Sequence, residues 1–218
     1  MPDHSHAPDA IAARINAPPG RGYLRDAVYG GIDGSVTTFA IVAGVAGAGL
    51  SPFVIVALGL ANVLADGFSM AAGNYSGTKA ELDNTKRLRA VEERHIARYP
   101  DGERQEVREI LAQKGLSGPV LEEATQAITS NREAWIQLML EGEYGLAPVD
   151  PHPIRAALAT FAAFLAAGLI PLLPFLIGLT GAFSWSVWMT ASVFFMIGAL
   201  KPSFSAESRS PTISARSS

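Results

Sequence analysis

Two long apolar blocks constrain the fold of this chain more than any other feature. Residues 27–76 contain only two charged side chains, Asp33 and Asp66, and residues 156–200 contain none. A membrane-spanning helix needs about 20 consecutive apolar residues, so each block is too long for one span and fits two. Because helices satisfy their own backbone hydrogen bonds in lipid, the blocks predict an all-α polytopic membrane protein. The four spans are expected at residues 27–49, 53–75, 154–176 and 183–200.

The segment between the two blocks has the opposite character. Residues 76–155 hold 11 Lys and Arg and 14 Asp and Glu, with apolar residues at helical spacing. This pattern predicts a helical domain outside the membrane. Three helices are expected, at residues 79–98, 103–114 and 119–144, and the first of them continues directly out of the second span.

The chain is therefore expected to consist of five parts. They are a disordered lead (1–22), two spans (23–76), a three-helix metal-binding bundle (77–152), two further spans (153–201) and a disordered or aberrant tail (202–218).

The distribution of positive charge predicts the orientation. Lys and Arg lie before the first span, throughout residues 76–155 and just after the fourth span, but not in the two short connecting turns. The positive-inside rule then places the N-terminus and the bundle in the cytoplasm. A bacterial inner membrane and a vacuole-like endomembrane both fit. The formal net charge of −3 argues against a nucleic-acid partner, and the lack of cysteine excludes thiolate metal sites.

Three side chains inside the apolar blocks are candidates for a metal pathway. A carboxylate in hydrocarbon is costly and usually faces a pathway or a partner, which draws attention to Asp33 and Asp66. Met70 lies one helical turn after Asp66, and its thioether favours transition metals over Mg²⁺ or Ca²⁺. The alternatives are a structural role for Asp66 at a helix end and simple packing for Met70.

The first span also carries small residues at helical spacing. Gly30 and Gly34 are four residues apart, as are Gly44 and Ala48. Such spacing lets helix backbones approach closely in lipid, either within one chain or between two copies.

In the charged segment, three pairs of potential ligands each project from one helix face. Together they offer carboxylates, an imidazole and a thioether, a set that suits Fe²⁺, Mn²⁺, Co²⁺ or Zn²⁺. Each pair taken alone also fits an ordinary solvated helix face. The pairs are Glu92 with His95, Glu103 with Glu106, and Met139 with Glu143.

Four motifs, in order along the chain, resemble the vacuolar iron transporter family. They are DAVYGGIDGSVTTFA at 26–40, GLANVLADGFSMAAGNY at 59–75, KGLSG at 114–118 and GLIPLLPF at 168–175. The resemblance covers about Tyr23 to Lys201, most of the chain.

This resemblance implies a homodimer in which each subunit has five spans and a cytoplasmic three-helix metal-binding domain, and in which divalent iron is exchanged for protons. It implies that Asp33 and Met70 form the transmembrane metal site. It also implies cytoplasmic ligands at Glu92, Glu103, Glu106, Met139 and Glu143.

The sequence departs from the family pattern at three places. His95 stands where many relatives have glutamate, and Leu140 stands where they often have a second methionine. The fifth span of the family is expected to be missing, because the motif resemblance stops at Lys201.

The predicted function is a membrane transporter that moves Fe²⁺, and other divalent transition metals such as Mn²⁺, out of the cytosol. Its partners would be the lipid bilayer, divalent metal ions, protons and a second copy of the chain, and no organic cofactor is expected. An enzyme is the less favoured alternative: a ferritin-like di-iron oxidase needs two Glu-x-x-His motifs, and this chain has one in its charged segment, at Glu92–His95. A non-transporting metal-binding membrane protein is the third hypothesis.

Overall fold

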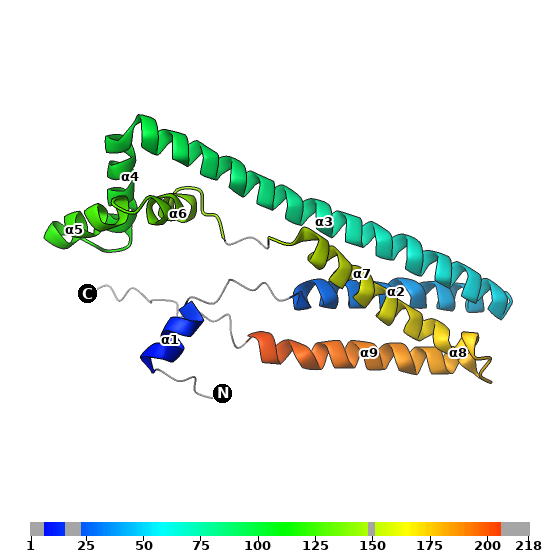
Figure 1. Ribbon diagram of the computed structural model, residues 1–218. Helices are drawn as coiled ribbons and strands as arrows, with labels where there is room; N and C mark the ends of the chain where they lie inside the picture. The colour runs from blue at the N-terminus through cyan, green and yellow to red at the C-terminus, as the bar shows by residue number, and fades with distance from the viewer. Residues whose placement is uncertain (1–6, 16–22, 148–150, 206–218) are drawn as a thin grey trace, which may run out of the picture. The chain divides into compact units, whose positions relative to one another are not determined.

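The computed structural model describes residues 7–15, 23–147 and 151–205, and these ranges contain helices, turns and no strand. Residues 206–218 of the expected tail, and residues 1–6 and 16–22 of the expected lead, lie outside the described ranges. The elements, in order, are α1 (Pro8–Ile15), α2 (Leu24–Gly47), α3 (Pro52–Arg98), α4 (Pro100–Gln113), α5 (Gly118–Thr129), α6 (Arg132–Gly142), α7 (Pro153–Leu169), the 3₁₀ turn η1 (Ile170–Leu172), α8 (Leu173–Leu176) and α9 (Ala182–Ser205) (Figure 1).

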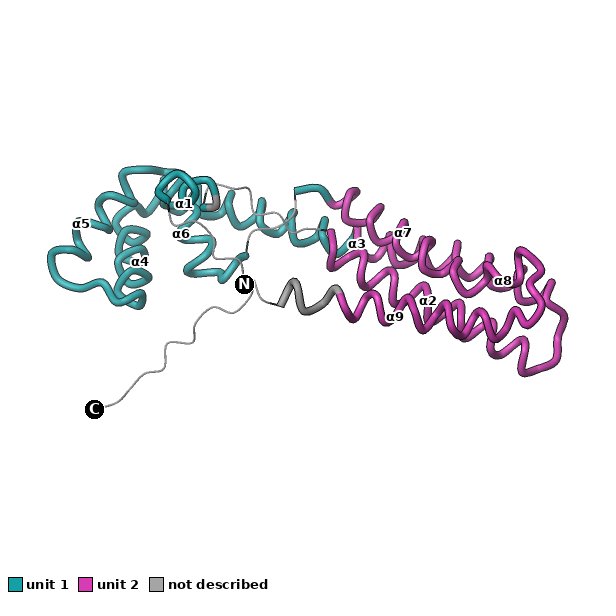
Figure 2. Tube along the Cα trace, turned by 90° about the horizontal axis from the view of Figure 1, so that it is seen from below, with its two compact units in different colours: residues 1–21, 76–152 teal, residues 22–75, 153–218 magenta. Residues whose placement is uncertain are grey.

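The chain folds as two compact units, which are distinguished by colour in Figure 2. Among the described residues, 23–75 and 153–205 form the membrane unit, and 7–15, 76–147 and 151–152 form the second unit, which contains the helical bundle. The long helix α3 is unbroken and contributes its first half to the membrane unit and its second half to the bundle.

The membrane unit contains four helical stretches that are long and apolar enough to cross a bilayer, among the residues described. They are residues 24–47, the first part of α3, residues 153–176 and residues 182–199. The prediction of an all-α polytopic protein with these four spans is therefore confirmed.

Glycines of α2 bring it against α7. A Cβ atom built on Gly30 would lie 2.5 Å from the backbone oxygen of Thr160, and one built on Gly34 would collide with the backbone oxygen of Phe164. At Gly44, by contrast, the space around such a Cβ is empty. The Gly30–Gly34 spacing therefore allows close contact between two helices of the same chain, the first of the two possibilities named above.

A polar contact ties α3 to the same face of α7. The side-chain amide of Asn74 donates to the hydroxyl of Thr160 at 2.7 Å and to the backbone oxygen of Ala156 at 3.3 Å. Farther along, a hydrophobic cluster closes the other end of this unit; it contains Val42, Val45, Ile55, Val63 and Leu172.

Two prolines, Pro171 and Pro174, end α7. Proline cannot donate a helical hydrogen bond, and its ring clashes with the preceding turn. The α-helix stops at Leu169, passes through one 3₁₀ turn at Pro171 and resumes for a single turn around Pro174. The hydroxyl of Ser186 on α9 donates to the backbone oxygen of Pro171 at 2.8 Å, which satisfies a carbonyl near this break.

The bundle packs α3, α4, α5 and α6 around a common apolar core. Its buried members are Ile96, Val107, Leu111, Leu121, Trp135, Ile136, Met139 and Leu140.

The prediction of a single helix over 119–144 is wrong. Two helices, α5 and α6, replace it because the chain is capped between them. The hydroxyl of Ser130 donates to the backbone oxygen of Ala127, and the side chain of Asn131 accepts from the backbone N–H groups of Glu133 and Ala134. Asparagine at this position stabilises the start of a new helix. The prediction of one continuous helix did not take this cap into account.

Three other boundaries differ from expectation. Residues 8–15 of the expected disordered lead form helix α1, which begins at Pro8 with Asp9 in its first turn, a favourable start for a helix. Helix α4 starts at Pro100 instead of Glu103, again with proline in the first turn. Helix α9 continues to Ser205, past the predicted end at Leu200 and into the expected tail.

The close contact between α2 and α7 predicts opposite effects for two glycine substitutions. Gly34→Ala is expected to destabilise the protein by about 1–3 kcal/mol, the usual range for overpacking, because the added carbon meets rigid backbone. Gly44→Ala, in the same helix, is expected to be neutral or to stabilise by about 0.5–1 kcal/mol. Thermal unfolding of the two purified variants in detergent checks this; a Gly34→Ala protein as stable as Gly44→Ala would contradict it.

Candidate metal centre

The corner between α3 and α4 gathers the candidate ligands. Only Tyr99 separates the two helices, and the proline that follows it forces Tyr99 out of the helical conformation, to φ −134° and ψ 54°. Backbone hydrogen bonds on both sides tighten the corner. The N–H of Tyr99 donates to the backbone oxygen of His95 at 2.7 Å, and the N–H of Glu103 donates to the backbone oxygen of Tyr99 at 3.1 Å. The first turn of α4 is thereby brought back onto the last turns of α3.

Three of the predicted ligands meet at this corner. Glu92, His95 and Glu103 each present one ligand atom, and these atoms lie within 4.8 Å of one another. The imidazole Nδ1 of His95 is 3.4 Å from Glu103 Oε1 and 4.0 Å from Glu92 Oε1. A metal ion bound by an imidazole and two carboxylates needs this kind of spacing, since metal–nitrogen and metal–oxygen bonds are about 2.0–2.2 Å long.

The two carboxylates are buried and incompletely satisfied. Glu92 is fully buried and Glu103 is 5 % exposed. Among the described residues, neither Glu92 Oε2 nor Glu103 Oε2 has a hydrogen-bond donor. Leaving a buried charged oxygen without a partner costs several kcal/mol or more. The residues therefore fit a cation, which would supply the missing positive charge.

The electrostatics link this corner to two further predicted ligands. Burial, together with the charges of Glu106 and Glu92, raises the pKa of Glu103 to about 7. Partial desolvation and the charges of Glu92 and Glu106 also raise the pKa of Glu143, although that residue lies at the surface. Like charges that shift each other's titration must lie close together. Glu106 and Glu143 thus belong to the same acidic cluster without sharing its burial.

Met139 takes a different position from the carboxylates. It is fully buried in the apolar core of the bundle, one turn before Glu143 on the sequence. Its role as a thioether ligand stays a prediction, while its contribution to the core is evident.

Tyr144 belongs to the centre and was missed by the sequence analysis. Its phenol donates to Glu92 Oε1 at 2.8 Å. Burial and this hydrogen bond raise the pKa of Tyr144, so the phenol keeps its proton and remains a donor. The only sequence signal was an aromatic hydroxyl directly after the predicted ligand Glu143, at the expected end of the helix 119–144.

The predicted transmembrane ligands lie in the membrane unit, on α2 and α3. Asp33, Asp66 and Met70 are all half-buried. Within the ranges that the structure covers, no hydrogen bond or ion pair joins these side chains. Near Asp33, the hydroxyl of Thr37 donates to the aspartate's backbone oxygen at 2.9 Å and accepts from the amide of Asn62 at 3.3 Å. Among the residues that the structure describes, the carboxylates of Asp33 and Asp66 therefore have no ion-pair partner.

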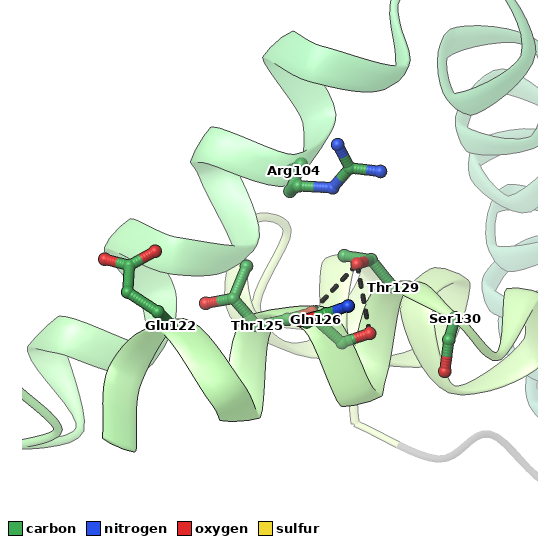
Figure 3. A pocket seen from close by; sticks show the side chains of 6 residues that line it. All are labelled: Arg104, Glu122, Thr125, Gln126, Thr129 and Ser130. Atoms are coloured by element: carbon green, nitrogen blue, oxygen red, sulfur yellow. Dashed lines mark hydrogen bonds between the residues drawn. The ribbon is translucent and has the colours of Figure 1, made fainter. Parts of the chain in front are cut away.

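A separate polar pocket of about 500 Å³ lies between α4 and α5 (Figure 3). None of the predicted ligands lines it. The hydroxyl of Thr129 is already engaged with the backbone oxygens of Thr125 and Gln126. The lining residues are Arg104, Glu122, Thr125, Gln126, Thr129 and Ser130. The candidate metal centre is therefore not this pocket but the corner of α3 and α4.

Comparison with known proteins gives relatives of one kind. The chain is 36% identical over 158 residues to vacuolar iron transporter 1 of Eucalyptus grandis, covering 70% of this chain and 62% of that protein. It is 34% identical over 184 residues to vacuolar iron transporter 1 of Arabidopsis thaliana, covering 83% and 74%. It is 38% identical over 164 residues to the vacuolar iron transporter of Toxoplasma gondii, covering 74% of this chain and 54% of that protein.

These relatives are named as transporters and not as enzymes, which favours the first prediction over the di-iron oxidase. The model of the VIT family matches residues 24–216, which includes both units and extends beyond Lys201, where the motif resemblance ends. The chain therefore belongs to the VIT family.

Proposed function

We propose that this protein transports Fe²⁺, and other divalent transition metals such as Mn²⁺, out of the cytosol in exchange for protons. The observation that carries the proposal is the meeting of two buried carboxylates, Glu92 and Glu103, with the exposed imidazole of His95. Each carboxylate has one oxygen without a donor among the described residues, and the chain is a VIT-family protein with four membrane-length helices. The membrane would be vacuole-like or a bacterial inner membrane, with the bundle on its cytoplasmic side as the charge distribution predicts.

The bundle is proposed to capture the ion before transport. Carboxylate and imidazole are ligands for Fe²⁺, Mn²⁺, Co²⁺ and Zn²⁺ alike. Glu92, His95 and Glu103 would hold the ion, and the charges of Glu106 and Glu143 would raise its local concentration. Since the pKa of Glu103 is about 7, an arriving cation would displace a proton from a partly protonated carboxyl at neutral pH.

The membrane unit is proposed to carry the ion across through Asp33, with Asp66 and Met70 one turn apart on α3. These side chains are half-buried in a single chain and no partner charge satisfies the carboxylates among the described residues. A second copy of the chain, facing the first, would complete the site. The support for such a homodimer is that the carboxylates of Asp33 and Asp66 lack a partner charge among the described residues. The exposed apolar side chains of α3, among them Phe53, Leu64 and Phe68, fit a lipid-facing surface.

Removal of a buried ligand should abolish tight metal binding. Glu103→Gln keeps the size of the side chain but removes its charge, and Fe²⁺ affinity is expected to fall by more than about tenfold, the lower bound for losing even an indirect partner of a metal. Glu109→Gln, an exposed carboxylate on the same helix, is the matched control and should bind normally. Anaerobic titration of the full-length protein in detergent measures both. Equal Fe²⁺ affinities in the two variants would show that the corner of α3 and α4 does not bind the ion.

The raised pKa of Glu103 also predicts a pH dependence of the metal-free protein. Its pKa is about 7 in the folded state and 4.5 without perturbation, so the folded protein binds more protons between these values. The associated stability is fully present below the lower value and is lost as the pH rises through about 7.

The unfolding temperature of the metal-free protein should therefore fall between pH about 5 and about 8, and Glu103→Gln should weaken that fall. A metal ion added at the higher pH should restore the stability of the wild type, because it replaces the lost proton. An unfolding temperature that rises over the same pH range in the wild type but not in Glu103→Gln would contradict the assignment.

Transport should depend on Asp33. In proteoliposomes, Asp33→Ala is expected to abolish Fe²⁺ flux and the accompanying proton flux, because the carboxylate has no substitute in the first span. Asp101→Ala, at an exposed position on α4, should leave flux unchanged. Normal flux in Asp33→Ala would refute the pathway, and metal binding without any flux in the wild type would favour the non-transporting alternative.

A further inference from the structure

The hydrogen bond between Tyr144 and Glu92 makes the two oxygens of the Glu92 carboxylate different from each other. The phenol donates to Oε1 at 2.8 Å. Oε2 is buried and has no donor among the described residues. Glu92 itself is completely buried, so its second oxygen is not exposed to bulk solvent in this structure. One oxygen is satisfied by the protein and the other is left for something else.

The loop after α6 holds Tyr144 in this position. The turn closes through the N–H of Leu146, which donates to the backbone oxygen of Leu140 at 3.0 Å. Gly145 follows Tyr144 with φ 63°, a left-handed conformation that favours glycine. Tyr144 and Leu146 both pack against the apolar core of the bundle. The phenol is therefore presented by a fixed turn, and its reach to α3 does not depend on a mobile side chain.

We propose that Tyr144 is a positioning residue that engages Glu92 Oε1 and thereby leaves Oε2 as the one oxygen of Glu92 that binds the metal ion. This inference rests on the proposed function and specifies its geometry. A carboxylate free to rotate can bind a metal through one oxygen or through both, whereas one held by a donor is restricted to one. Partners that orient ligands in this way typically contribute about 10–100-fold to metal affinity.

The position of His95 supports the same division. Its Nδ1 is 3.4 Å from Glu103 Oε1 but 4.0 Å from Glu92 Oε1, so the imidazole does not compete for the hydrogen bond that Tyr144 makes. The phenol and the imidazole thus occupy the Oε1 side of their respective carboxylates, and both Oε2 atoms are left without donors. Each carboxylate therefore keeps one oxygen, Oε2, that no protein group among the described residues satisfies.

The test uses Co²⁺ as the probe, because its visible absorption reports the coordination number, and full-length protein in detergent. Tyr144→Phe removes only the hydroxyl. It is expected to weaken Co²⁺ binding by about tenfold or more and to change the visible spectrum of the bound ion as Glu92 becomes free to bind through both oxygens. Tyr99→Phe is the matched control, an exposed tyrosine at the same corner, and should retain the affinity and spectrum of the wild type.

A double-mutant cycle separates positioning from a merely structural role. In a Glu92→Gln background, Tyr144→Phe should have no further effect on Co²⁺ affinity, because the residue through which it acts is already gone. An undiminished tenfold loss in that background would overturn the proposal. So would a Tyr144→Phe protein with unchanged affinity and unchanged spectrum.

A second measurement needs no variant at Tyr144. Adding Co²⁺ to the wild type should perturb the ultraviolet absorption of tyrosine, since the acceptor of its hydroxyl becomes a metal-bound carboxylate, and Glu92→Gln should lose this signal. A wild type that binds Co²⁺ without the perturbation would overturn the role of Tyr144 alone. A wild type that does not bind the ion at all would instead overturn the proposed function of the bundle.

Discussion

The unfavourable burial of two carboxylates at one helix corner underlies the arrangement of the bundle. Glu92 and Glu103 are almost completely removed from solvent, and one oxygen of each has no donor among the described residues. An uncompensated buried carboxylate opposes folding by several kcal/mol, so the surrounding structure must hold it in place. The apolar core of α3, α4 and α6, the tight turn at Tyr99 and the hydrogen bond from Tyr144 together do so. Because burying these carboxylates is unfavourable for folding, a binding site for a cation explains them better than packing does.

In the membrane unit, the close packing of two helices lies beside a charged side chain, Asp33. Gly30 and Gly34 bring α2 into backbone contact with α7 on one side, and Asp33 lies between them in sequence. A helix that meets its neighbour through glycines leaves little free volume there, so a half-buried carboxylate at Asp33 lies at the edge of a rigid contact. Rigidity of this kind is useful in a pathway, because it keeps a ligand from collapsing onto its own backbone in the absence of the ion.

Most of the fold could be predicted from charge and periodicity. Two long apolar blocks with almost no charge predicted the four spans, and the structure places them there. The boundaries that failed depend on single side chains: the cap at Asn131, within the polar residues 129–133, divides the helix predicted over 119–144. The pairing of Glu92 with His95 was visible because helical spacing is local. The contact of this pair with Glu103 depends on the angle of the corner at Tyr99. The contact from Tyr144 to Glu92 joins residues 52 positions apart. Local sequence patterns predict neither contact.

The same features bear on how a captured ion would leave the bundle. A site that only stored metal would gain from complete satisfaction of its ligands and from carboxylates that ionise well below neutrality. Here a buried carboxyl titrates at about pH 7, so protons and metal compete for it under ordinary conditions. Because Tyr144 holds Glu92 Oε1, a captured ion would be bound in one defined arrangement, and a proton returning to Glu103 would loosen it. Weak but specific coordination is what a donor to a transport pathway needs, since binding that is too tight would stop release at the first step.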